Sequence, residues 1–231
     1  MLEALLTARL KHKNVVEVFG FMRTKKIEVG LVMELSDRGS LDKWIGKIDS
    51  SKLKKLALGI VDGLAYVHSQ GVIHRDIKPK NILMFGPEDD MIPKIADFGV
   101  SKLIQAATAT HTEVGQGLYM APEVRLFNRY SFPADVFSLA VTLFEVFNEQ
   151  LICQSSAEVQ QFVSRVHASR IGAIPKCCKV PLYLHSLITS GLDENPKHRP
   201  DLSQFCAAFG GYRSVYISHI HRILSTIVST G

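Results

Sequence analysis

Long apolar segments are missing from the sequence, and this absence argues against a membrane protein. The longest candidate, residues 136–144, ends at Glu145 and is far shorter than the ~20 apolar residues that a membrane helix needs. The first residues carry an acid at Glu3 and no small-residue cleavage site, so we expect no signal peptide. These absences predict a soluble, cytoplasmic protein that does not contact a membrane.

Cysteine is scarce and unpatterned. Neither CxxC spacing nor a run of histidines accompanies the four cysteines, which are Cys153, Cys177, Cys178 and Cys206. This pattern argues against a zinc site or a disulfide framework and favours reduced thiols in a cytosolic protein. The formal net charge is only +5 and the basic residues are scattered, so nothing indicates a nucleic-acid partner.

The apolar periodicity of the sequence predicts an α+β fold. β-Branched and aromatic residues indicate strands early in the chain, whereas apolar residues three and four apart indicate helices later. The predicted strands span residues 15–21, 28–35, 72–73, 82–84 and 94–96. The predicted helices span residues 2–10, 41–45, 51–69, 136–147, 155–168, 182–190 and 202–209.

Three short motifs follow one another in the central part of the chain. HRDIKPKN occupies residues 74–81, DFG residues 97–99 and APE residues 121–123. Together they resemble the catalytic loop, the metal-binding segment and the end of the activation segment in eukaryotic protein kinases. The resemblance implies a protein-kinase-like fold with a mostly helical C-lobe and a smaller N-lobe.

This resemblance assigns roles to four polar residues of the motifs. Asp76 matches the catalytic base that accepts the proton of a protein hydroxyl, and Lys78 matches the lysine that stabilises the γ-phosphate of ATP. Asn81 and Asp97 match the residues that hold Mg²⁺, a hard cation that prefers oxygen ligands. Lys78 also favours a serine/threonine kinase acting on a protein substrate, and DFGVSK at residues 97–102 resembles the tyrosine-kinase-like branch.

A second set of residues matches the nucleotide-binding hinge of the family. Met33 occupies the gatekeeper position, and the backbone groups of Glu34 to Ser36 would bond the adenine of ATP. Leu83 would pack beneath the adenine ring. The resemblance therefore implies ATP and Mg²⁺ as cofactors.

Two parts of the kinase pattern have no counterpart in the 231 residues: the glycine-rich phosphate loop and the lysine strand that grips ATP. Glu3 matches the glutamate that normally pairs with this lysine. We expect a single kinase domain over residues 1–231, truncated at its N-terminus, with 1–35 as a partial N-lobe and 36–231 as hinge and C-lobe. Such a chain would transfer phosphate poorly by itself. The alternative is a non-catalytic kinase-like scaffold. The intact Asp76, Lys78, Asn81 and Asp97 argue against it, whereas the missing phosphate-gripping parts favour it for these 231 residues.

Regulation is also implied by the resemblance. Thr112 matches the phosphorylation site of the activation segment, where Arg75 would bind the phosphate after an upstream kinase has acted. Thr108 and Thr110 are weaker candidates for the same site. Gln116 replaces the threonine that normally contacts the catalytic aspartate and lysine, which argues against high activity.

Two buried anchors complete the resemblance. Asp135 resembles the aspartate that holds the catalytic loop from a central helix. Arg199 resembles the arginine that pairs with Glu123. A buried bidentate pair of this kind supports the structure, because breaking it would leave one charge desolvated.

Overall fold

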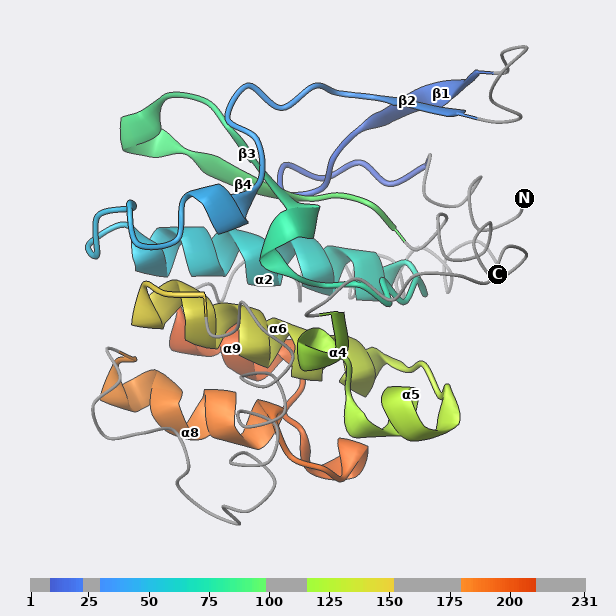
Figure 1. Ribbon diagram of the computed structural model, residues 1–231, viewed down its shortest axis with the longest axis vertical. Coiled ribbons are helices and arrows are strands. Elements are labelled where there is room, and N and C mark those ends of the chain that lie inside the picture. The colour runs from blue at the N-terminus through green and yellow to red at the C-terminus, as the bar shows by residue number, and fades with distance from the viewer. Residues whose placement is uncertain (1–8, 23–29, 99–115, 152–179, 211–231) are drawn as a thin grey trace, which may run out of the picture.

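The computed structural model describes residues 9–22, 30–98, 116–151 and 180–210. Short strands form one layer and helices are stacked below it (Figure 1). The strands are β1 (Val18–Met22), β2 (Gly30–Met33), β3 (Ile82–Phe85) and β4 (Ile92–Ile95). The helices are α2 (Leu53–Ser69), α4 (Gln116–Tyr119), α5 (Pro122–Phe127), α6 (Phe132–Asn148), α8 (Leu182–Gly191) and α9 (Leu202–Ala208). Short 3₁₀ turns are η1 (Leu41–Lys43), η2 (Pro79–Asn81), η3 (Glu88–Asp90) and η4 (Pro196–His198). The mixture confirms the predicted α+β class.

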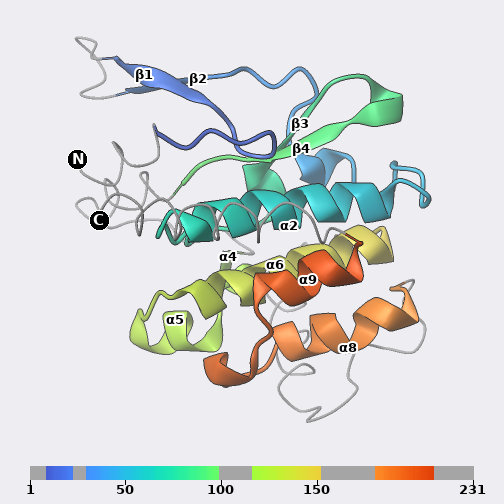
Figure 2. The same ribbon diagram turned by 180° about the vertical axis from the view of Figure 1, so that it is seen from behind.

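α6 is the central helix of the helical layer. Every residue from Ala134 to Phe147 is buried, and a helix that is apolar on all sides is stable only when its neighbours enclose it. α2 and α8 pack against α6, with α8 below it in the views of Figure 1 and Figure 2, and α9 packs against α2 and α8. α6 begins earlier than predicted, at Phe132, because Pro133 suits the first turn of a helix. No helix within the described ranges is long and apolar enough to span a bilayer.

The strands form two antiparallel pairs. β1 pairs with β2, and β3 pairs with β4 with Ile82 opposite Ile95. Four of the predicted strands are thus confirmed with shifted ends, but the strand predicted at residues 72–73 is wrong. Val72 N donates to Val67 O at the end of α2, and the N–H groups of His74 and Arg75 donate to the side chain of Asp135. These bonds take the place of pairing with another strand.

The segment before β1 is fastened to both β4 and α2. Asn14 O accepts a hydrogen bond from Ile95 N at 2.9 Å, and Val16 N donates to Ile95 O at 2.9 Å. The buried side chain of Asn14 donates through Nδ2 to Pro93 O at 2.8 Å. α2 approaches so closely that a Cβ atom at Gly63 would lie 2.5 Å from Asn14 O. The absence of a side chain at Gly63 therefore lets the strand layer sit directly on α2.

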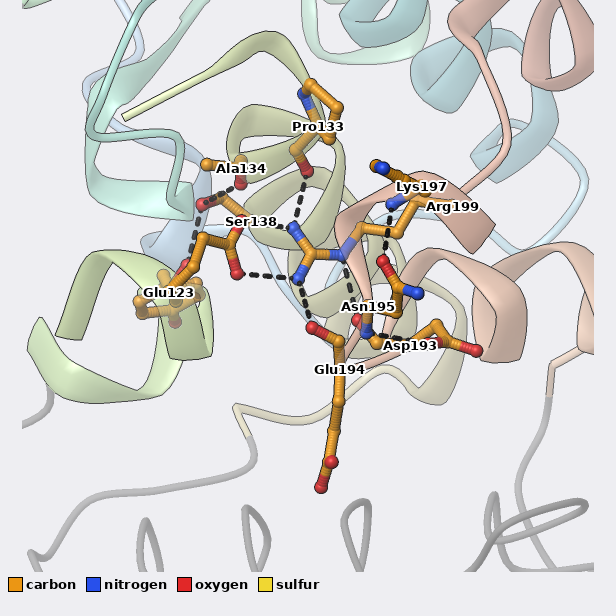
Figure 3. Close-up of polar contacts among 10 residues, drawn as sticks. Glu123, Pro133, Ala134, Ser138, Asp193, Glu194, Asn195, Lys197 and Arg199 are labelled. Atoms are coloured by element: carbon orange, nitrogen blue, oxygen red, sulfur yellow. Dashed lines mark hydrogen bonds and ion pairs between the residues drawn. The ribbon is translucent and has the colours of Figure 1, made fainter. Parts of the chain in front are cut away.

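A buried ion pair connects α5 to the segment after η4, beside the first turn of α6 (Figure 3). Arg199 donates through Nη1 to Glu123 Oε1 at 2.6 Å and through Nη2 to Glu123 Oε2 at 2.8 Å. Its remaining donors reach Pro133 O at 2.9 Å and Asp193 O at 2.8 Å. The side chain of Arg199 is 0% exposed, and Phe137 lies beside its guanidinium. The predicted pairing of Arg199 with Glu123 is confirmed.

We predict that Arg199→Ala lowers the free energy of unfolding by about 3–5 kcal/mol, because Glu123 would keep a largely buried charge without its partner. Urea denaturation followed by circular dichroism measures the change. Arg199→Lys keeps the charge but cannot form the bidentate contact, so it should recover only part of the loss.

The matched control is Lys55→Ala in the exposed pair of Lys55 with Asp90. Its two side chains are 72% and 60% exposed. Removal of this pair should change the free energy of unfolding far less than Arg199→Ala does, because water screens and solvates both charges. Equal losses in Arg199→Ala and Lys55→Ala would contradict a supporting role for the buried pair.

Candidate active site

The loop that carries HRDIKPKN lies between α2 and β3 and is anchored by one carboxylate. Asp135 Oδ2 accepts hydrogen bonds from His74 N at 2.7 Å and from His68 Nε2 at 2.8 Å. Asp135 Oδ1 accepts one from Arg75 N at 2.8 Å. Asp135 is 1% exposed and projects from the first turn of α6. Charged acceptors form the stronger hydrogen bonds in proteins, so the loop backbone is fixed to the most enclosed helix.

His74 connects this loop to the segment after β4. Its Nδ1 accepts from Asp76 N at 3.2 Å, so Nε2 carries the proton and donates to Ala96 O at 2.9 Å. The ring is fully buried and lies 5.0 Å from the ring of Phe98. Burial lowers the pKa of His74, partly opposed by the charge of Asp135. The imidazole is therefore a neutral link at physiological pH.

The structure brings together the three polar residues predicted on this loop. Asp76 Oδ2 lies 3.0 Å from Lys78 Nζ and accepts from Asn81 Nδ2 at 2.9 Å. Asn81 Nδ2 also donates to Asp76 O at 2.8 Å. The side chains of Asp76 and Lys78 are 18% and 12% exposed, so they face a site that a substrate can still reach. Asp76 also lines a pocket that includes Tyr119 and Tyr130.

Asp97 lies next to Asn81 through the backbone. Ala96 N donates to Asn81 O at 2.9 Å, which places the following residue, Asp97, beside the loop. Asp97 is exposed and has a φ of +63°, a left-handed conformation that a residue with a side chain seldom adopts. Arg75, the residue before Asp76, has a φ of +71°. Such strain persists only where surrounding contacts enforce it, and at Arg75 the bond from its N–H to Asp135 is one such contact.

The side chains of Asn81 and Asp97 suit a hard cation. Asn81 Nδ2 donates both of its hydrogen bonds to Asp76, so Oδ1 is the Asn81 side-chain atom that could bind a cation. Within the described residues, no hydrogen bond engages that oxygen or the Asp97 carboxylate. Oxygen donors of this kind are those that Mg²⁺ prefers. Their role in holding the metal stays a prediction.

The predicted hinge residues use their side chains for internal contacts. Lys94 Nζ donates to Glu34 Oε2 at 2.6 Å and to Glu34 Oε1 at 2.8 Å. Glu34 Oε1 also accepts a hydrogen bond from Glu17 N at 2.8 Å. Ser36 Oγ donates to Met84 O at 2.7 Å. The Glu34 carbonyl and the Ser36 N–H have no hydrogen-bond partner in the part of the chain that the structure describes. They are the backbone groups predicted to bond adenine.

Leu83 faces the same region from β3. It is half-buried, whereas its neighbours Ile82 and Met84 are fully buried, in accordance with the alternation of side chains along a strand. The ion pair of Glu34 with Lys94 and the hydroxyl contact of Ser36 were missed by the sequence analysis. Their partners lie about 50 to 60 positions apart, where no local pattern signals a contact.

Several predicted residues lie outside the described ranges. These are Glu3, the phosphorylation candidates Thr108, Thr110 and Thr112, and the side chain of Gln116. The helices predicted at residues 2–10 and 155–168 also fall there, apart from the last residues of the first. Arg75 is described, and its guanidinium lies 5.7 Å from the ring centre of Tyr130.

The fold and these motifs define a kinase-type domain, and comparison with known sequences agrees. Residues 1–208 match the family described as Protein kinase domain. The Serine/threonine/tyrosine-protein kinase HT1 of Arabidopsis thaliana is 32% identical over 215 residues, covering 91% of this chain and 54% of that protein. The Serine/threonine-protein kinase ULK1 of Homo sapiens is 28% identical over 214 residues, covering 88% of this chain and 20% of that protein. The chain therefore belongs to the protein kinase family, and it spans about half the length of HT1 and a fifth of ULK1.

The buried His74 predicts an acid-sensitive fold. Because its pKa is lowered from 6.5 in the folded state, the unfolded chain binds a proton more readily below that pH. Stability should therefore fall as the pH drops from about 6.5 towards 5, and His74→Gln, which does not titrate, should show a shallower fall. Urea denaturation at a series of pH values measures both slopes.

His12 is the control, because burial lowers its pKa as well. His12→Gln should remove only part of the pH dependence, since His12 is about half buried and His74 is fully enclosed. Identical slopes for the wild type and His74→Gln would show that His74 is not the titrating group.

Proposed function

We propose that this protein is an ATP-dependent serine/threonine kinase that transfers the γ-phosphate of ATP to a hydroxyl group of a protein substrate. The observation that carries the proposal is the contact of Asp76 with Lys78 and Asn81 on a loop anchored by Asp135. A scaffold needs packing and surface, but it has no physical need to hold a carboxylate and an ammonium together at an accessible edge.

Phosphoryl transfer requires positioning and charge stabilisation more than covalent chemistry. In the proposed reaction the substrate hydroxyl oxygen attacks the γ-phosphorus, the bond to the bridging oxygen of ADP breaks, and Asp76 accepts the hydroxyl proton. Lys78, 3.0 Å from Asp76, offsets negative charge on the transferred group.

The residues that would hold Mg²⁺ are Asn81 and Asp97. The metal supplies positive charge to the phosphate oxygens when it is bound. Asn81 Nδ2 orients the carboxylate of Asp76 while its Oδ1 serves the metal, so one residue would align the base and the nucleotide phosphates. Adenine would bond to the backbone of Glu34 and Ser36 above Leu83.

Preference for serine or threonine is supported by Lys78 and by the similarity to several serine/threonine-protein kinases. The chain's own substrate is a protein that presents such a hydroxyl. We place the hinge boundary of the kinase domain at residue 36, with 1–35 in the N-lobe and the rest in the C-lobe.

Asp76→Asn is expected to lower turnover about 10²- to 10⁴-fold, the usual contribution of a positioned general base. The affinity for ADP should not change, because Asp76 contacts the hydroxyl and not the nucleotide. The protein is expressed from its complete coding sequence, and transfer of labelled phosphate to a generic basic protein is measured beside calorimetric titration of ADP.

Asp90→Asn is the matched control, because Asp90 is exposed on η3 and should leave turnover at the wild-type value. If Asp76→Asn keeps more than about a tenth of the turnover, Asp76 is not the base. A wild-type protein that binds ADP but transfers no phosphate would identify the scaffold alternative.

Thr112 is proposed as the site where an upstream kinase activates the protein, with Arg75 as the group that receives the phosphate. Thr112→Ala should lower activity to the level of phosphatase-treated wild type, whereas Thr108→Ala should not. Mass spectrometry of the active protein locates the phosphate. Full activity without modification at Thr112 would contradict the proposal.

A further inference from the structure

Ser36 is tied to three backbone groups through a single hydroxyl. Its Oγ accepts from Gly39 N at 2.8 Å and from Arg38 N at 3.3 Å. The same atom donates to Met84 O at 2.7 Å. A hydroxyl has one proton and two lone pairs, so all of its hydrogen-bonding capacity is used. Gly39 O is 3.2 Å from the hydroxyl, but it already accepts from Met84 N at 2.8 Å.

These bonds attach residues 36–40, which we term the hinge strap, to the edge of β3. Both backbone groups of Met84 bond to the strap, and Ser40 forms an isolated antiparallel bridge with Leu83. In the middle of the strap, Arg38 Nε donates to Gly86 O at 2.9 Å. The strap is therefore attached to β3 along its length, although it forms only an isolated bridge and no strand of its own.

Ser36 thus connects the hinge backbone to β3, the two parts of the proposed adenine slot. Its own N–H is one of the hinge groups proposed to bond adenine, and its hydroxyl holds the carbonyl of Met84. Leu83, the proposed floor beneath the base, precedes Met84 on β3 and points to the opposite face of the strand. The length of the contact between Ser36 and Met84 consequently determines how far the hinge backbone stands from the floor.

We propose that the Ser36 hydroxyl is a positioning group that sets the width of the adenine slot and so determines the affinity for the base. This inference rests on the proposed function, because it assigns the slot to adenine. The hydroxyl itself does not contact the nucleotide. Its effect passes through the backbone of Ser36 on one side and through β3 to Leu83 on the other.

Ser36→Ala leaves Met84 O without its side-chain donor and two strap N–H groups without an acceptor. The dissociation constant for ADP should rise about five- to tenfold, the loss that corresponds to one net hydrogen bond. Adenosine, which has no phosphates, should weaken by the same factor, since the defect lies in the base slot.

Two further variants separate positioning from general stability. Ser36→Thr keeps the hydroxyl and should restore the affinity for adenosine. Ser69→Ala is the matched control, since Ser69 Oγ donates to Tyr66 O at 2.7 Å at the far end of α2. It removes the same type of bond and should alter the melting temperature without altering nucleotide affinity.

Titration calorimetry with adenosine and ADP, beside thermal melting, is performed on the protein expressed from its complete coding sequence. If the wild type binds adenosine and Ser36→Ala binds it equally well, the inference is wrong while the proposed function stands. If Ser36→Ala weakens ADP but not adenosine, the hydroxyl does not act on the base and the inference is again wrong. A wild type that binds neither ligand overturns the proposed function and this inference together.

Discussion

The carboxylate of Asp135 is the interaction on which the site depends. It is buried at 1% exposure and would be costly to enclose without partners, yet it accepts bonds from two consecutive backbone N–H groups and from His68. Because α6 is enclosed by its neighbours, its first turn is held in place by packing. The bonds from that turn to His74 N and Arg75 N fix the loop that carries Asp76, including the left-handed backbone at Arg75.

From Asp135 a continuous series of hydrogen bonds reaches the predicted metal residues. His74, held by its N–H, uses its ring to bond Ala96 O, and Ala96 N bonds Asn81 O. Asn81 in turn orients Asp76. The segment that leads to Asp97 and the loop that carries Asp76 are therefore one unit. Hydrogen bonds in a dry interior reinforce one another, which explains why a neutral, fully buried histidine stands at the centre of this unit.

The segment that carries Glu34 and Ser36 is held by different contacts. Glu34 and Ser36 are held by Lys94 and Met84, both on the β3–β4 pair, and not by the helical layer. The same pair carries Leu83, so hinge and floor share a single small sheet. This sheet is attached to α2 through Asn14 and the close approach at Gly63. The loop that carries Asp76 and the segment that carries Glu34 and Ser36 are thus fixed by separate hydrogen-bond networks.

Much of the molecule could be predicted from the sequence, because its signals are local. Periodicity predicted α2, α6, α8 and α9, and the order of three motifs indicated the family to which the chain belongs. The false strand at residues 72–73 shows the limit, since Val72 N bonds to the end of α2 and the next residues, His74 and Arg75, bond through their N–H groups to a carboxylate some 60 positions away.

The sequence by itself determined which chemical groups the site contains. Only the tertiary structure decided which atoms of Asn81 and Ser36 are engaged in hydrogen bonds. The Ser36–Met84 bond joins segments far apart in the sequence, and the Asn81–Asp76 bonds depend on the loop conformation that Asp135 holds.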